Sequence, residues 1–111
     1  RLPELFTGLG RNEFPSVVGY PTSCSPQAWA AASPLLFVWT LLRLEPWVPH
    51  GKVWLSPAVP AAIGPLRVEG IPLAGSRVTV VVDAEGGFTV DGLPPGIDVL
   101  TDPRDPLTAT R

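Results

Sequence analysis

Few residues in this sequence could act as a nucleophile or as a metal ligand. Cys24 is the only cysteine and His50 is the only histidine. A thiol becomes a useful nucleophile when a base lies beside it, and His50 lies on a separate turn flanked by proline. We therefore expect Cys24 to be a small buried hydrophobic residue. No second His or Cys forms a plausible metal site with His50, so no metal is expected.

The carboxylates offer a different chemistry. Asp83, Glu85, Asp91 and Asp98 come at the ends of predicted strands, where solvated turn carboxylates are expected rather than a calcium site. Glu4 lies in a proline-containing loop. Glycoside hydrolysis needs two carboxyl groups across the scissile bond. A lone glutamate in a loop is, by its type alone, more typical of the surface or of a turn cap.

The composition sets limits on the class of protein. The chain has 111 residues, of which 45% are hydrophobic and 16% are charged, whereas soluble domains carry about a quarter charged residues. We expect part of this apolar surface to be covered by a partner, because a short chain buries less of its surface. The chain begins with Arg1 rather than Met, and we expect it to be a piece of a longer protein.

The charges bear on binding to nucleic acid, and the cysteine content bears on the cellular compartment. The net charge is −2 and the eight basic residues are scattered, which argues against binding to nucleic acid. A single cysteine forms no internal disulfide and fits a reducing compartment, so we expect a cytoplasmic protein. Nothing in the sequence calls for a cofactor.

A helix is the strongest predicted element of the first half. Ser25 is a natural N-cap with Pro26 at the favoured first helical position, and Pro46 ends the helix near Leu44. Pro34 should kink it. The segment is apolar on all sides, which predicts a helix buried among neighbours. It falls short of the ~20 residues that a membrane span needs, so no membrane is expected.

The remaining segments predict a loop before the helix and strands after it. Residues 1–24 contain prolines and glycines that favour an extended loop. The segment 77–82 is β-branched almost throughout and predicts the strongest strand. The other predicted elements are strands at 52–55, 66–69, 88–90 and 97–100, turns at 70–75 and 85–87, and a flexible tail from about residue 102. The expected order is therefore loop, buried helix and antiparallel β-meander.

Two segments carry a resemblance to a known family. Residues 1–8 (RLPELFTG) and residues 20–31 (YPTSCSPQAWAA) resemble motifs of bacterial amylo-α-1,6-glucosidase-like, or glycogen-debranching, proteins. Residues 52–57 and 66–82 are also similar to the C-terminal region of that family. The resemblance extends over about the whole chain. Thr7 departs from it, since cysteine is common there, and the loop at residues 11–16 is not typical.

The resemblance implies an architecture. The parent would be a glucoamylase-like glycoside hydrolase whose catalytic domain is an (α/α)6 toroid of paired helices. The chain would be an α+β fragment of it. Residues 1–46 would supply the last loop and the last, long and buried helix, and residues 47–111 a β-rich appendage. The missing upstream part of the parent would be its partner.

The resemblance also implies roles for individual residues. Glu4 would be the general base of an inverting, two-carboxylate hydrolysis of α-glucosidic bonds, with the acid upstream and the isolated chain inactive. Tyr20, Gln27 and Trp29 could line a sugar subsite, although the apolar surroundings favour a core position for Trp29, and Tyr20 is a similar case. Trp39, Trp47 and Trp54 are expected to be packing residues. The alternative to an enzyme part is a non-catalytic carbohydrate-binding or accessory β-rich module.

Overall fold

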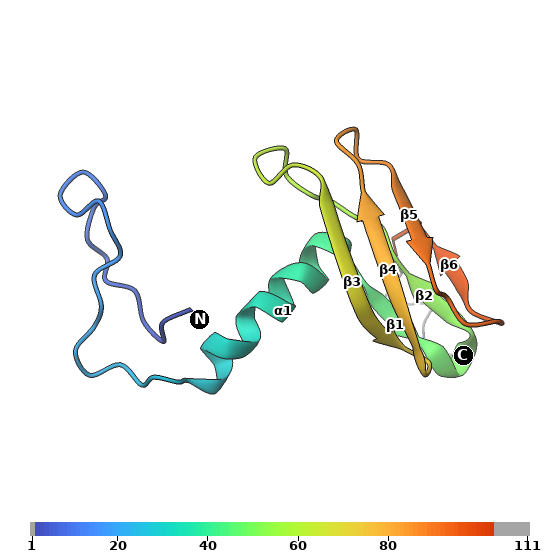
Figure 1. The fold of residues 1–111 in the computed structure, drawn as a ribbon, viewed down its shortest axis with the longest axis horizontal. Helices are drawn as coiled ribbons and strands as arrows, with labels where there is room; N and C mark the ends of the chain where they lie inside the picture. The colour runs from blue at the N-terminus through green and yellow to red at the C-terminus, as the bar shows by residue number, and fades with distance from the viewer. Residues whose placement is uncertain (1, 104–111) are drawn as a thin grey trace. The chain divides into compact units, whose positions relative to one another are not determined.

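The computed structural model describes residues 2–103, which form two compact units, Arg1–Phe37 and Val38–Arg111 (Figure 1). The elements, in chain order, are α1 (Ala28–Leu42), β1 (Glu45–Trp47), a short 3-10 turn (Val48–His50), β2 (Lys52–Trp54), β3 (Leu66–Leu73), β4 (Ser76–Val82), β5 (Phe88–Asp91) and β6 (Asp98–Leu100). The first unit consists of the N-terminal loop and most of α1, and the second contains all six described strands.

The C-terminal end of α1 is closed by a Schellman motif. The Leu44 N–H donates to the Trp39 carbonyl at 3.1 Å, and the Arg43 N–H donates to the Thr40 carbonyl at 3.2 Å. Arg43 takes the left-handed conformation that this motif requires, with φ of 47°. Glycine usually occupies this position, because a side chain there costs about 1–2 kcal/mol.

The last two carbonyls of α1 are bound by the chain that follows β2. The Ser56 N–H donates to the Leu42 carbonyl at 3.2 Å, and the Ala58 N–H donates to the Leu41 carbonyl at 2.8 Å. Together with the Schellman motif, these bonds give a partner to all four carbonyls that a helix leaves unpaired at its C-terminus. The end of α1 is therefore fixed firmly into the second unit.

One sheet has the strand order β3-β4-β5 and is antiparallel throughout. In β4, Val78, Val80 and Val82 are buried and alternate with more exposed residues, as expected for a strand with one face on a core. β3 continues through residues 70–73 of the predicted turn, and the turn itself is formed by Ala74 and Gly75. The strand accommodates Gly70, at φ 75°, in an irregularity of the pairing between Val68 and Ile71.

The other sheet has the order β1-β2-β6, in which β1 and β2 are antiparallel and β2 and β6 are parallel. Gly51 begins this parallel contact. Its carbonyl accepts the Asp98 N–H at 2.8 Å, its φ is 64°, and an added Cβ would lie 2.7 Å from the Gly96 carbonyl oxygen. Only glycine fits there without displacing backbone.

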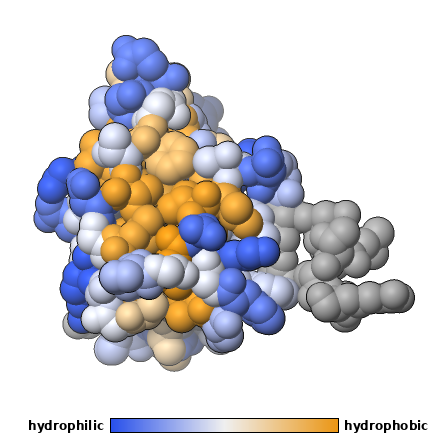
Figure 2. Space-filling model, turned by 90° about the vertical axis from the view of Figure 1, so that its right-hand side faces the viewer, coloured by the Kyte–Doolittle hydropathy of each residue, from blue (hydrophilic) through white to orange (hydrophobic). Residues whose placement is uncertain are grey.

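The hydrophobic core of the second unit draws on both sheets and on the end of α1. Its buried members are Leu42, Leu44, Val53, Leu55, Leu73, Val78, Val80 and Val82. Phe88 and Val90 of β5 and Val99 of β6 pack against it and are partly buried. Figure 2 shows apolar side chains gathered on the side that carries β5 and β6, bordered by hydrophilic residues.

The predicted fold class is wrong in its two main features. α1 is not a long buried helix: Trp29, Leu35 and Leu36 are 64%, 71% and 64% exposed, so the described chain is a small α+β fold and no remnant of a toroid. The strands do not form one antiparallel meander, because β6 leaves β5 and pairs with β2 in a separate sheet. The fully apolar sequence of α1 predicted burial, but only its C-terminal end lies in a core.

Two further expectations concern the ends of the chain and the membrane. The flexible tail expected from about residue 102 lies, beyond Pro103, outside the described residues. Within residues 2–103, α1 is too short to be a candidate for a membrane-spanning helix, and the structure offers no other.

Candidate functional site

The side chain of Glu4, in the RLPELFTG segment, binds two residues of the YPTSCSPQAWAA segment. Its Oε2 accepts the backbone N–H of Cys24 in a short hydrogen bond, and its Oε1 accepts the side-chain amide of Gln27 at 2.9 Å. These contacts bridge 20 and 23 residues of sequence. The structure therefore brings residues of the RLPELFTG segment and of the YPTSCSPQAWAA segment together at one carboxylate.

Gln27 holds Glu4 against the start of α1. Its backbone carbonyl accepts the Ala31 N–H at 3.0 Å, which is the first hydrogen bond of the helix, and its Oε1 accepts the Ala28 N–H at 3.1 Å. With the amide oxygen bound to the helix, the amide nitrogen is directed at Glu4. The predicted Ser25 cap is wrong, because α1 begins at Ala28 and the side chain of Gln27 accepts the N–H of that residue.

The two donors favour the ionised form of Glu4. The Cys24 backbone N–H, and after it the Gln27 amide, lower the pKa of the Glu4 carboxyl below its ordinary value of 4.5, and the Cys24 side chain adds to the effect. Desolvation opposes them. Each carboxylate oxygen has two lone pairs, so each retains an acceptor position after these bonds. Glu4 is thus a charged acceptor at neutral pH.

The other predicted site residues have different positions. The described hydrogen bonds of Glu4 do not include Tyr20 or Trp29, whose side chains are 49% and 64% exposed. The Tyr20 carbonyl accepts both the N–H and the hydroxyl of Ser23, which shapes the turn before Cys24. The core position considered for Trp29 is wrong, and so is the expected burial of Cys24, which is an exposed free thiol.

Cys24 contributes to the site through its backbone, which sequence reasoning missed. A backbone donor leaves no signal in the residue type, because every residue except proline has an N–H. Within the described residues, both hydrogen-bond partners of Glu4 are N–H donors. Neither is the second carboxyl group that glycoside hydrolysis requires. In the same unit, the Phe6–Val18 loop encloses a separate hollow of about 260 Å³, whose lining does not include Glu4.

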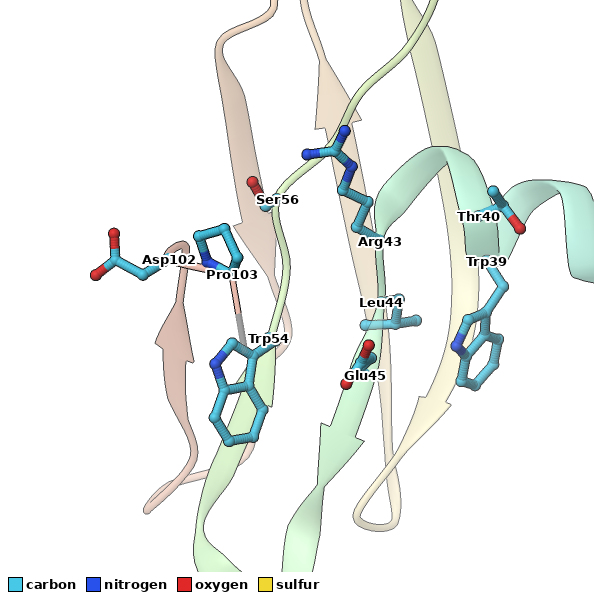
Figure 3. A pocket seen from close by; sticks show the side chains of 9 residues that line it. All are labelled: Trp39, Thr40, Arg43, Leu44, Glu45, Trp54, Ser56, Asp102 and Pro103. Carbon is cyan, nitrogen blue, oxygen red and sulfur yellow. The ribbon is translucent and has the colours of Figure 1, made fainter. Parts of the chain in front are cut away.

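A larger pocket lies in the second unit, with a volume of about 490 Å³. It is lined by Trp39, Thr40, Arg43, Leu44, Glu45, Trp54, Ser56, Asp102 and Pro103. Figure 3 shows Trp39 and Trp54 on opposite sides of Leu44 and Glu45. Trp39 is 43% exposed, so its prediction as a packing residue is wrong.

Edge-to-face packing supports the indole of Trp54 in this pocket. The Trp47 and Trp54 ring centroids are 5.9 Å apart at 89°, an arrangement that aromatic pairs favour. Trp47 also contacts the His50 ring, at 5.0 Å between centroids. His50 therefore belongs to an aromatic cluster. Within the described residues, no group of three or more His, Cys, Asp or Glu side chains could hold a metal ion.

Comparisons with known proteins give no match to a protein-family model, to a curated protein or to a solved structure.

Proposed function

We propose that the chain is part of a glycoside hydrolase of the glycogen-debranching, amylo-α-1,6-glucosidase-like type, in which Glu4 is the general base. The observation that carries the proposal is the convergence at Glu4: the two segments that resemble that family meet there, through the Cys24 N–H and the Gln27 amide. Two chain segments are thus joined by a single carboxylate, which would otherwise be an ordinary loop residue.

The chemistry at Glu4 fits a base that activates water. The carboxylate is ionised in the neutral range and can accept a proton, and its two donors fix its orientation. In an inverting reaction this carboxylate takes a proton from water while a second carboxyl group protonates the leaving oxygen. That acid would come from the rest of the enzyme, so the isolated chain would be inactive.

The exposed apolar side chains of the first unit support a covering partner. Phe6, Phe14 and Phe37 are 58%, 42% and 56% exposed, and large exposed apolar side chains contribute to interfaces. The remainder of the hydrolase is the partner we propose for it, in the cytoplasm. The helical toroid that the resemblance implied is no part of the proposal, because most of α1 is exposed and the described chain is a small α+β fold.

The test is Glu4→Gln in the complete hydrolase. Loss of the base should lower kcat on an α-glucan by roughly 10²-fold or more, with little change in stability. Glu13→Gln is the matched control, since Glu13 is an exposed carboxylate of the same N-terminal loop, and it should leave turnover unchanged. Equal turnover of the two variants would contradict the role of Glu4 and favour the alternative, a non-catalytic carbohydrate-binding or accessory module.

A further inference from the structure

We propose that the pocket at the end of α1 binds one pyranose ring of an α-glucan, with Trp39 and Trp54 contacting the ring and Arg43 and Glu45 contacting its hydroxyl groups. The choice of an α-glucan rests on the proposed function; the pyranose ring follows from the pocket itself. The pocket would be a second glycan subsite, formed entirely by residues of Val38–Arg111.

The lining combines flat apolar surfaces with charged and hydroxyl groups. Two indoles lie on opposite sides of Glu45, and Thr40 and Ser56 add hydroxyls. Small-molecule sites have this composition, mostly apolar with a few placed polar groups, and volumes of roughly 300–1,000 Å³. The volume of about 490 Å³ falls in this range.

A pyranose ring is the ligand whose chemistry matches this lining. It has faces of C–H groups that fit against an indole and a rim of hydroxyls that donate and accept hydrogen bonds. The lining contains both signs of charge, Arg43 against Glu45 and Asp102, which favours a neutral, hydroxyl-rich ligand over a phosphate or an organic cation. The Asp102 carboxylate points away from the indoles, so Glu45 is the carboxylate nearer to the ring (Figure 3).

The backbone at Arg43 is a second, independent observation. Arg43 holds a left-handed conformation at φ 47°, at the position where a Schellman motif usually has glycine. Sparsely populated backbone conformations cluster at ligand sites, and the Arg43 side chain lines the pocket beyond the indoles, toward Ser56. The surrounding backbone is fixed by the hydrogen bonds of Leu44 and Ser56 to α1, so the pocket is preformed.

The experiment is a titration of the 111-residue chain with maltotriose, followed through the indole N–H signals of its tryptophans by NMR. Trp39 and Trp54 should shift in a saturable manner, and Trp29, which is 64% exposed in the other unit, should not. Sorbitol, which has hydroxyls but no ring face, should shift none of them. Absence of a saturable Trp39 shift, or an equal shift of Trp29, would overturn the proposal.

Two variants separate binding from folding. Trp39→Ala should weaken maltotriose binding about tenfold or more, whereas Trp29→Ala should bind as the unmodified chain does. Arg43→Gly relieves the left-handed strain, so it should weaken binding while the midpoint of urea unfolding stays the same or rises. Unchanged binding in both Trp39→Ala and Arg43→Gly would overturn the proposal.

The same maltotriose titration of the Glu4→Gln variant tests the subsite separately from the general-base role of Glu4. The variant should bind maltotriose normally at Trp39. Normal binding together with unimpaired hydrolysis in the complete Glu4→Gln enzyme would overturn the base and leave the subsite standing. Impaired hydrolysis without any Trp39 shift would overturn the subsite alone.

Discussion

The two units of the chain, Arg1–Phe37 and Val38–Arg111, differ in how they are held together. The second unit contains eight of the nine buried apolar residues among those described, and the first contains only Ala30. In the first unit the long-range order comes from polar contacts, above all those of Glu4 with Cys24 and Gln27. The second unit thus contains the hydrophobic core, and the first contains the candidate site at Glu4.

The difference shows that stability and site geometry have separate origins in this chain. Apolar burial contributes about 25 cal/mol per Å² and adds up over a whole core, whereas a hydrogen bond contributes about 1 kcal/mol net. The bonds of Glu4 can orient one carboxylate, but they cannot stabilise a loop whose Phe6 and Phe14 remain exposed. This contrast yields three predictions.

The largest expected effect is on the core. Leu42→Ala removes a fully buried side chain, at 0% exposure, and should lower the free energy of unfolding by about 2–5 kcal/mol. Leu35→Ala, in the same helix at 71% exposure, should change it by less than about 0.5 kcal/mol. Urea unfolding followed by tryptophan fluorescence measures both. Equal effects would contradict the assignment of the core to the second unit alone.

An intermediate effect is expected at the start of the β2–β6 contact. Gly51→Ala introduces a side chain at φ 64° and a Cβ 2.7 Å from the Gly96 carbonyl oxygen, and should destabilise the second unit by roughly 1–3 kcal/mol. Gly64→Ala is the matched control, with φ of 76° and nothing within 4 Å, and should show the backbone cost alone. Similar losses in the two variants would mean that the close approach to Gly96 is unimportant.

The smallest effect on stability, and the most specific to the site, is expected at Gln27. Gln27→Met removes the amide that donates to Glu4, so the pKa of Glu4 should rise toward 4.5 while the unfolding of the second unit is unchanged. NMR titration of the Glu4 carboxyl measures this. Because the folded pKa is lowered, the contribution of these bonds is complete above the unfolded value and is lost as the pH falls through the folded value.

Two outcomes would contradict the prediction for Gln27→Met. A Glu4 pKa unaffected by Gln27→Met would mean that the amide does not orient the carboxylate. Loss of the Glu4 contacts on raising the pH from 5 to 7, rather than on lowering it, would contradict the sign of the pKa shift.

Much of the second unit could be predicted from local patterns. The β-branched residues of 77–82 predicted β4, and the Glu85–Gly87 turn predicted the hairpin with β5, which the pairing of Val82 with Phe88 confirms. The strand at 66–69 was predicted too short, because Gly70 suggested a turn and instead occupies an irregularity within β3. β1 was missed, since three residues after a helix carry no periodic signal.

The candidate site was predictable only in part. Glu4 and Gln27 were both chosen as candidates, and the structure joins them directly. Tyr20 and Trp29, chosen with them, make no described hydrogen bond to Glu4. The pocket at Trp39 and Trp54 was missed, because two indoles that are 15 residues apart on a helix and a strand share a pocket only through the packing of those elements.

The sequence by itself determined the elements whose signals are local: the presence of a helix before Pro46, the valine-rich strand β4 and the hairpin that follows it. Side-chain alternation and turn residues act over a few positions, so they can be recognised without the fold. Only the tertiary structure decided that β6 pairs with β2, that α1 joins the hydrophobic core at its C-terminal end alone, and that Cys24 presents its backbone N–H to Glu4. These outcomes depend on contacts between distant segments, and free energies of that kind are set by the packing of the whole chain.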